Sequence, residues 1–196
     1  MMINMKAVLI LLLVVSGSIL NAAPEKFELD ASHSQVVFSY NHLGFSTTTG
    51  MFSGFEGQII FDEDDPAASS VTVSMPVMSM FTGWEARDGH FMSDDFFNAS
   101  ADDMISFSST DIEITGENAA NITGDLSMNG VIKSVTLATT LNNAAPYPFG
   151  SKAGTPTLGF DATTTLLRSD FDLGAFAPAV SDAVEVFISI EALQAE

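Results

Sequence analysis

The stretch AVEVFISIEA (residues 183–192) alternates apolar and polar side chains along most of its length. Every second residue from Val184 to Ile190 is aliphatic, whereas Glu185 and Glu191 fall on the opposite face. A period of two is typical of a β-strand that buries one face and leaves the other in water. The end of the chain therefore predicts one strand of a sheet whose core lies on one side.

The same period recurs along the chain, with turn-forming residues such as Asn129-Gly130 between the segments. The other predicted strands cover residues 27–30, 34–43, 47–62, 70–77, 105–115, 121–128, 133–141 and 157–167. Residues 142–156 are expected to form a loop rich in Pro, Gly, Ser and Asn. Residues 82–101 lack alternation and predict a short helical insert with Ser93 or Asp94 as its cap.

Strands with one apolar face must bury it against a second sheet or around a closed interior. About eight antiparallel strands closed into a barrel leave an interior just wide enough for side chains or one small ligand. A β-sandwich is the competing all-β architecture. The chain has 16 Phe and 10 Met but only 2 Tyr and 1 Trp, a bulky apolar filling with few hydrogen-bond donors. That composition fits a plain core as well as an apolar cavity.

Charge and cysteine content exclude several classes of function. The chain has 25 Asp and Glu against 6 Lys and Arg, which gives a net charge of -19. Such a protein repels nucleic-acid backbones and anionic lipid headgroups, so no nucleic-acid partner is expected. With 0 Cys it has no disulfide, thiolate nucleophile or Cys-ligated metal. No cofactor and no metal are expected.

The first 22 residues predict a secretory signal peptide. Lys6 precedes an apolar run over residues 7–20, and small residues around Ala22 follow it. The run is shorter than the roughly 20 residues that cross a bilayer, so no stable membrane insertion is expected. We expect cleavage after Ala22, a single domain over residues 23–196, and a periplasmic or secreted protein.

A series of motifs stands in order along the rest of the chain. They are FELDASHS (27–34), NHLGFS (41–46), GMF (50–52), FEG (55–57), RDGHFMSDDFF (87–97), ISFSS (105–109), GDLSMNGVIKSVTL (124–137) and LRSDF (167–171). This series resembles the YceI-like family of polyisoprenoid-binding domains. The resemblance implies an all-β fold, an extended antiparallel eight-stranded lipocalin-like β-barrel with a short helical insert. It also implies an exported carrier whose lumen holds a long-chain isoprenoid or another amphiphilic lipid, an isoprenoid quinone being one candidate.

The more apolar face of each predicted strand supplies candidates for ligand contact. The expected wall residues are Val36, Phe38, Tyr40, Met51, Phe55, Ile59, Val73, Met75, Phe107, Leu126 and Met128. The expected mouth residues are His42, Trp84, Arg87 and His90. Apolar walls measure mainly volume, so any preference for a headgroup has to come from the few polar side chains.

Few residues offer catalytic or metal-binding chemistry. His33, His42 and His90, with Asp30 and Asp88 nearby, have no metal-binding spacing, and hydrogen-bonded histidines at a barrel mouth are the more ordinary interpretation. No Gly-x-Ser-x-Gly elbow is present, which argues against a hydrolase.

The scarce arginines invite pairing with carboxylates. Arg168 is expected to pair with Asp170. Arg87 is expected to pair with a neighbouring carboxylate or, alternatively, to contact a ligand headgroup.

Three classes of function remain open from the sequence. The first is a non-enzymatic carrier of a long-chain isoprenoid or fatty lipid for transport, storage or sequestration. The second is an enzyme acting on such a lipid, which requires His42 or His90 beside a carboxylate in a wet cavity. The third is a ligand-free structural or stress-response barrel. A homodimer is compatible with each of them.

Overall fold

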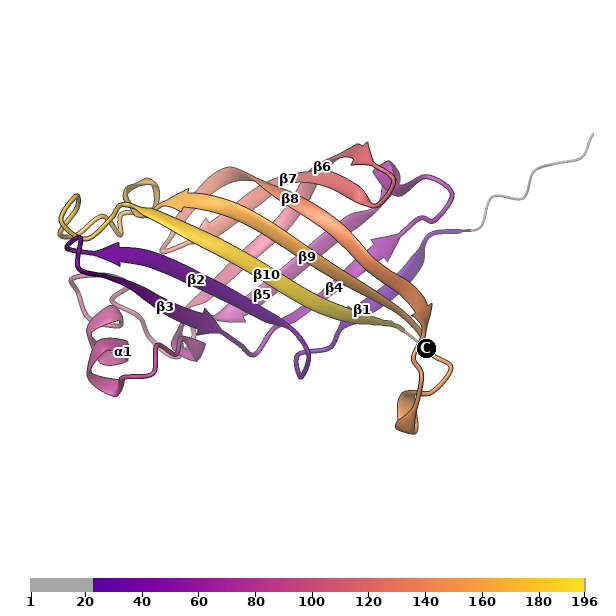
Figure 1. Ribbon diagram of the computed structural model, residues 1–196, viewed down its shortest axis with the longest axis horizontal. Helices are drawn as coiled ribbons and strands as arrows, with labels where there is room; N and C mark the ends of the chain where they lie inside the picture. The colour runs from indigo at the N-terminus through magenta and orange to yellow at the C-terminus, as the bar shows by residue number, and fades with distance from the viewer. Residues whose placement is uncertain (1–22, 196) are drawn as a thin grey trace, which may run out of the picture.

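The computed structural model describes residues 23–195 (Figure 1). The predicted signal peptide lies outside the described residues. The strands are β1 (Glu25–Leu29), β2 (Gln35–His42), β3 (Ser46–Phe52), β4 (Glu56–Phe61), β5 (Ser70–Pro76), β6 (Met104–Gly116), β7 (Ala119–Met128), β8 (Val131–Pro146), β9 (Pro156–Leu167) and β10 (Ala183–Gln194). The helices are α1 (Glu85–Phe91) and four 3₁₀ turns, η1 (Pro66–Ala68), η2 (Val77–Ser79), η3 (Gly150–Lys152) and η4 (Arg168–Phe171).

The strands form a closed antiparallel barrel rather than two stacked sheets. Hydrogen-bonded neighbours run β1-β4-β5-β6-β7-β8-β9-β10, and β1 pairs with β10 to close this ring of eight. The β2–β3 hairpin lies beyond β1 and pairs with the first half of β10. The predicted eight-stranded barrel with a short helix is therefore confirmed, and the sandwich alternative is wrong.

Two sides of the barrel are each formed by two short successive strands instead of one long strand. β1 and β2 pair with successive parts of β10, at Ala192–Gln194 and Glu185–Ser189 respectively. In the same way, β3 and β4 replace the single strand predicted over residues 47–62. The break contains Gly54 with φ +69°, a left-handed conformation that glycine adopts without strain.

Strands β8 and β9 are longer than the alternation predicts. β8 continues to Pro146, and only the segment between it and β9 remains a loop, whereas residues 142–156 were all expected to be loop. The register shifts between Leu141 and Asn143, so one residue is added on β8 relative to β9. Such a bulge breaks the period of two without ending the strand.

The helical insert is present, but its helix begins earlier than expected. Trp84 is the N-cap residue, and its carbonyl accepts the backbone N–H groups of Arg87 and Asp88. Ser93, one of the two expected caps, lies after the helix and donates its hydroxyl to the carbonyl of His90. The polar residue at 93 therefore marks the end of α1 rather than its start. No helix within residues 23–195 is long and apolar enough to cross a membrane.

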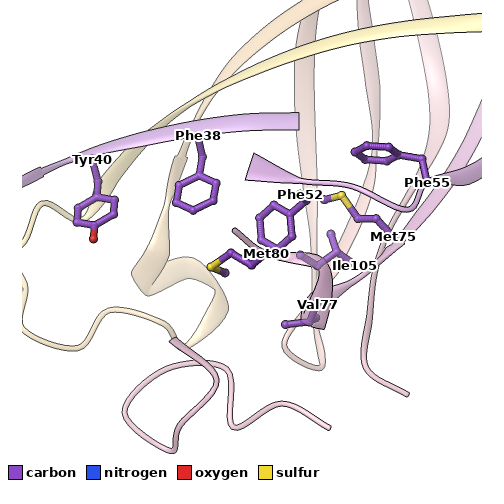
Figure 2. Close-up of a cluster of buried hydrophobic side chains, with 8 residues drawn as sticks. All are labelled: Phe38, Tyr40, Phe52, Phe55, Met75, Val77, Met80 and Ile105. Atoms are coloured by element: carbon purple, nitrogen blue, oxygen red, sulfur yellow. The ribbon is translucent and has the colours of Figure 1, made fainter. Parts of the chain in front are cut away.

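Two clusters of buried apolar side chains lie inside the barrel. The first cluster lies beside the β2–β3 hairpin and the insert, and Figure 2 shows its side chains from separate strands converging on the same interior. It comprises Phe38, Tyr40, Phe52, Phe55, Met75, Val77, Met80 and Ile105. The second cluster lies near the two ends of the described chain and comprises Phe27, Ile59, Leu158 and Ala192.

Candidate functional site: an apolar lumen

A cavity of about 350 Å³ runs along the inside of the barrel. Its wall is built from the inward faces of the strands, where alternate residues such as Val184, Val186, Ile188 and Ile190 of β10 point to the interior. Ile122 and other residues of β7 and β8 also point to the interior. Their side chains are nevertheless only half-buried, although they do not face the solvent around the barrel. A solid core would cover these side chains completely. The barrel is therefore hollow along its middle.

Most of the expected wall residues line this cavity. They are Val36, Phe38, Tyr40, Phe55, Ile59, Val73, Met75, Phe107, Leu126 and Met128. Their contact with a ligand stays a prediction, since their position shows only that they face the lumen.

Met51 does not line the cavity, which corrects the expectation for β3. Its neighbour Phe52 points into the lumen instead. Met51 forms an antiparallel bridge with Phe81, with both backbone N–H···O distances at 2.9 Å. The sequence pattern placed Met51 in phase with Phe55, but the break at Gly54 shifts the phase between β3 and β4.

Several residues that line the cavity are not among the expected wall residues. They include Phe52, Val71, Ile112, Ile114, Ile122, Val135, Leu137, Leu141, Phe160, Ala162 and Leu166, together with the aliphatic face of β10. The alternation in residues 183–192 indicates that the aliphatic face of β10 is buried. That pattern was sufficient to predict the wall residues of β10. Ile112 and Ile114 follow a register shift in β6 between Ser109 and Asp111, so the period from Phe107 alone does not reach them.

None of the expected mouth residues lines the cavity, which corrects the expected position of the mouth. His42 is exposed at the end of β2, and Trp84 is exposed at the start of α1. His90 lies outside the lumen, with Nε2 2.9 Å from a carboxylate oxygen of Asp95. These residues gather around the insert, where Phe91, Phe96 and Phe97 cover the inner end of the cavity.

Among the described residues, Arg87 forms no ion pair with a carboxylate, and it does not line the cavity. Its Nε donates to the hydroxyl of Thr82 at 2.8 Å, and its Nη2 donates to the carbonyl of Thr82 at 2.7 Å. Thr82 is in turn hydrogen-bonded to Asp88, so the expected ionic partner acts only through Thr82. Arg87 also lies 5.8 Å from the ring of Trp84. This arginine therefore positions the start of α1.

Arg168 reaches the inner end of the cavity, but carbonyl groups occupy its guanidinium. It donates to the carbonyls of Ser181, Leu173, Ala175 and Val180. The expected pairing with Asp170 is wrong, because that carboxylate lies 3.7 Å from Lys133 instead. Burial lowers the pKa of Arg168 below its ordinary value, with Asp182 acting in the opposite direction.

We predict that Arg168→Met destabilises the fold strongly. The substitution removes the donors to four carbonyl groups in residues 173–181. A hydrogen bond to a charged group contributes up to about 3 kcal/mol to the free energy of unfolding. Because water can replace some of these donors, a loss of about 3 kcal/mol in the free energy of unfolding is expected in urea denaturation. Lys133→Met, which removes an exposed ion pair, should change it by less than about 1 kcal/mol. Equal losses would contradict this role for Arg168.

The histidines do not form a common site. His33 lies at the break between β1 and β2, where its Nδ1 is 2.9 Å from Asp30 and 3.9 Å from Glu191. Donor atoms of these three residues lie within 4.8 Å of one another. The Nζ of Lys152, 2.6 Å from Asp30, already supplies a positive charge to this cluster. An ion pair with Lys152 explains the geometry without a metal.

The ion pair makes stability depend on pH. Burial raises the pKa of Asp30, but hydrogen bonds from Lys152, Ser32 and His33 outweigh burial and hold the pKa well below its usual range. A carboxylate with a lowered pKa stabilises the fold fully above its unfolded-state pKa, about 3.9 for Asp, and progressively less as the pH falls below that value.

Lys152→Met should therefore lower the free energy of unfolding at pH 7, and the difference from the unmodified protein should shrink as the pH falls from about 5 to about 2.5. Urea denaturation at each pH measures this difference. Lys26→Met, which breaks an exposed pair with Glu28, is the control and should show little effect at any pH. A difference that does not vary with pH would contradict the role of Lys152.

The cavity opens at the end of the barrel opposite α1. Apart from Leu167, its exposed lining residues lie in η1, the start of β5, the end of β6 and the β6–β7 turn, whereas Tyr40 and Leu173 at the other end are buried. Figure 1 shows the β4–β5 and β6–β7 turns at the end of the barrel away from α1. The exposed lining residues of this end are Pro66, Ser70, Ile114, Gly116, Glu117 and Asn118.

Comparison with known proteins identifies the family. The YceI-like domain matches residues 27–192, nearly all of the barrel. The chain belongs to the YceI-like domain family. A UPF0312 protein of Ectopseudomonas mendocina is 37% identical over 194 residues, covering 99% of this chain and 100% of that protein.

Solved structures of YceI-like and related barrels share the fold. BcnA of Burkholderia cenocepacia has a TM-score of 0.72 and 25% identity, covering 83% of this chain and 98% of BcnA. A polyisoprenoid-binding domain from Saccharophagus degradans has a TM-score of 0.66 and 14% identity, covering 86% of this chain and 98% of that domain. At that identity the second comparison supports the fold alone.

Proposed function

We propose that this YceI-like protein is a non-enzymatic carrier that holds a polyisoprenoid or another long-chain amphiphilic lipid in its lumen. The observation that carries the proposal is the apolar cavity of about 350 Å³ inside a closed barrel. A cavity lined by aliphatic and aromatic side chains does not hold water well, but it accepts an apolar ligand. A hydrocarbon tail is the ligand that matches such a wall.

Binding would be driven by removing the tail from water. Each Å² of apolar surface buried contributes roughly 25 cal/mol, less the cost of ordering a flexible chain. The wall includes Phe107, Leu126 and Met128, whose side chains measure volume and offer no directional contact to a tail. We therefore expect weak discrimination among tails of similar length, whether isoprenoid or fatty.

One structure with the same fold gives the proposal a precedent. A protein with the same fold is named as a polyisoprenoid-binding domain. The choice of an isoprenoid for this chain, including an isoprenoid quinone, remains part of the proposal. We also propose that the carrier works in the periplasm or outside the cell, on the basis of the signal peptide expected over residues 1–22.

Two alternatives have less support. An enzyme acting on the lipid would need an acid or base in the lumen, and neither His42 nor His90 lines it. Asp161 contributes to the lining and one of its oxygens is buried without a hydrogen bond, but no histidine lies in the lining with it. A ligand-free barrel would be expected to fill its interior, whereas here the middle is hollow.

Organic extraction of the purified protein followed by mass spectrometry tests the carrier proposal. The expected result is an amphiphile with a long hydrocarbon tail at near one molecule per chain. Protein unfolded, stripped and refolded should then take up farnesol or a fluorescent polyene fatty alcohol. Failure to recover a lipid and failure of stripped protein to bind either probe would together overturn the proposal.

A further inference from the structure

The open end of the cavity decides which headgroup can be held, given the carrier function proposed above. A tail in the lumen places its polar head at the surface where the cavity meets water. The exposed lining residues there include Ser70, Glu117 and Asn118, which we call the rim. Ser70 begins β5 just after η1, and Glu117 and Asn118 form the β6–β7 turn. The two parts of the rim lie close together because η1 packs beside β6.

The rim is acidic. Glu117 is an exposed acidic residue that lines the opening. Residues 62–65, Asp-Glu-Asp-Asp, precede η1, and Asp62 accepts the backbone N–H groups of Asp64 and Asp65. These acids are exposed or half-buried, and they directly precede Pro66, which lines the opening. A negatively charged headgroup at the rim would meet charges of its own sign.

Within residues 23–195, the two lysines at this end of the barrel are already paired with carboxylates. Of the lysines at that end of the barrel, Lys26 is 2.9 Å from Glu28 and Lys152 is 2.6 Å from Asp30. Among residues 23–195, the other basic side chains are Arg87, Lys133 and Arg168, all near α1 or η4 at the far end.

Arg168 cannot serve as an internal anion site. It lines the inner end of the cavity, but four hydrogen bonds to backbone carbonyls use most of the five N–H groups that a guanidinium carries. The surroundings are aromatic, with the ring of Phe96 6.0 Å from the guanidinium carbon. An anion drawn to this end would lose its hydration without gaining donors.

The rim does offer neutral hydrogen-bonding groups. Ser70 and Asn118 are exposed residues at the edge of the opening, and neither side chain has a hydrogen bond within the described part of the chain. A hydroxyl and an amide both donate and accept hydrogen bonds. They fit a headgroup that carries a hydroxyl or carbonyl oxygen.

We propose that the lumen selects amphiphiles whose headgroup bears no negative charge, such as a long-chain alcohol or a ketone, and rejects carboxylates and phosphates with the same tail. Ser70 and Asn118 hold the headgroup, and Glu117 is the specificity-determining residue that repels anions.

The test compares three probes with one tail: farnesol, farnesoic acid and farnesylamine. Stripped and refolded protein is titrated with each probe at pH 8 and low salt, below the concentration at which the probe aggregates. The expected result is that farnesol and farnesylamine bind at least about fivefold more tightly than farnesoic acid, the ratio that roughly 1 kcal/mol of repulsion produces. The ratio should fall as salt is raised, because salt screens exposed charges.

Two charge-reversal variants locate the source of the discrimination. Glu117→Lys should strengthen the binding of farnesoic acid about fivefold or more while leaving farnesol nearly unchanged. Glu185→Lys makes the same change in net charge on the outer face of β10, near the far end. This control should leave the ratio unchanged, because only a charge at the opening acts on the headgroup.

The outcomes separate this inference from the carrier proposal. If no probe binds, the carrier proposal itself fails. If all three probes bind equally, or if farnesoic acid binds best, the lumen carries lipid but the headgroup inference is overturned. If both variants change the ratio to the same extent, net charge rather than Glu117 is responsible, and the assignment to the rim is overturned.

Discussion

Ala120→Trp is expected to yield a folded barrel that purifies without bound lipid. Ala120 faces the lumen from β7, between Ile114 of β6 and Thr139 of β8. A tryptophan side chain there would occupy the cavity close to its opening, where the tail of a ligand must pass. Filling an apolar cavity adds van der Waals contacts, so the free energy of unfolding should not fall as it does when a filled core is overpacked.

The measurement is the amount of lipid extracted per mole of protein, with farnesol affinity as a second readout. We expect both to fall by about tenfold or more, which corresponds to ~1.4 kcal/mol of lost binding. Ala138→Trp is the matched control, because Ala138 lies on β8 with its side chain exposed outside the barrel. Lipid retained by the plugged variant at the control level would show that the ligand does not occupy the lumen.

Phe55→Asp is expected to have the largest effect of any single substitution considered. Phe55 is 3% exposed and belongs to the first buried cluster as well as to the cavity lining (Figure 2). Removing a buried phenylalanine side chain costs about 3–5 kcal/mol, and a carboxylate in the same place adds a desolvation cost. Both the stability of the barrel and its capacity for lipid should therefore be lost.

Phe187→Asp is the control for this substitution. Phe187 is 41% exposed on the outer face of β10, between the inward-facing Val186 and Ile188. Its replacement should leave the bound lipid in place and change the free energy of unfolding by about 1 kcal/mol or less. Thermal unfolding measures the stability of both variants, and lipid extraction measures the amount of lipid that each retains. Equal loss of lipid in the two would contradict the assigned facing of the strands.

Much of the wall could be predicted because its signal is local. In a strand, a side chain's face follows from its position in the alternation, so residues such as Val73, Phe107 and Leu126 could be assigned without knowing the partners of their strands. The assignment failed where the backbone interrupts the period. Met51 was misplaced because Gly54 adopts φ +69° between β3 and β4, a conformation that any stretch containing glycine can adopt or avoid.

The mouth could not be predicted from residue types. His42, Trp84, Arg87 and His90 are the polar and aromatic residues that a ligand-binding mouth commonly uses, but they surround the covered end of the barrel. The open end carries Glu117 and Asn118, which look like ordinary turn residues in the sequence, and Ser70, which looks like the first residue of a strand. Which turns meet at which end depends on strand order and closure, and those are long-range properties.

The amino-acid sequence by itself determined that this protein is all-β, which face of most strands is apolar, and that its motifs are those of the YceI-like family. These properties follow from periodicity and from residues close together in the chain. Only the tertiary structure decided that the interior is hollow, which end of it is open, and that Arg168 binds carbonyls instead of Asp170. The reason is that a cavity and its opening are set by how distant strands pair and pack, and no local pattern records the space that is left between them.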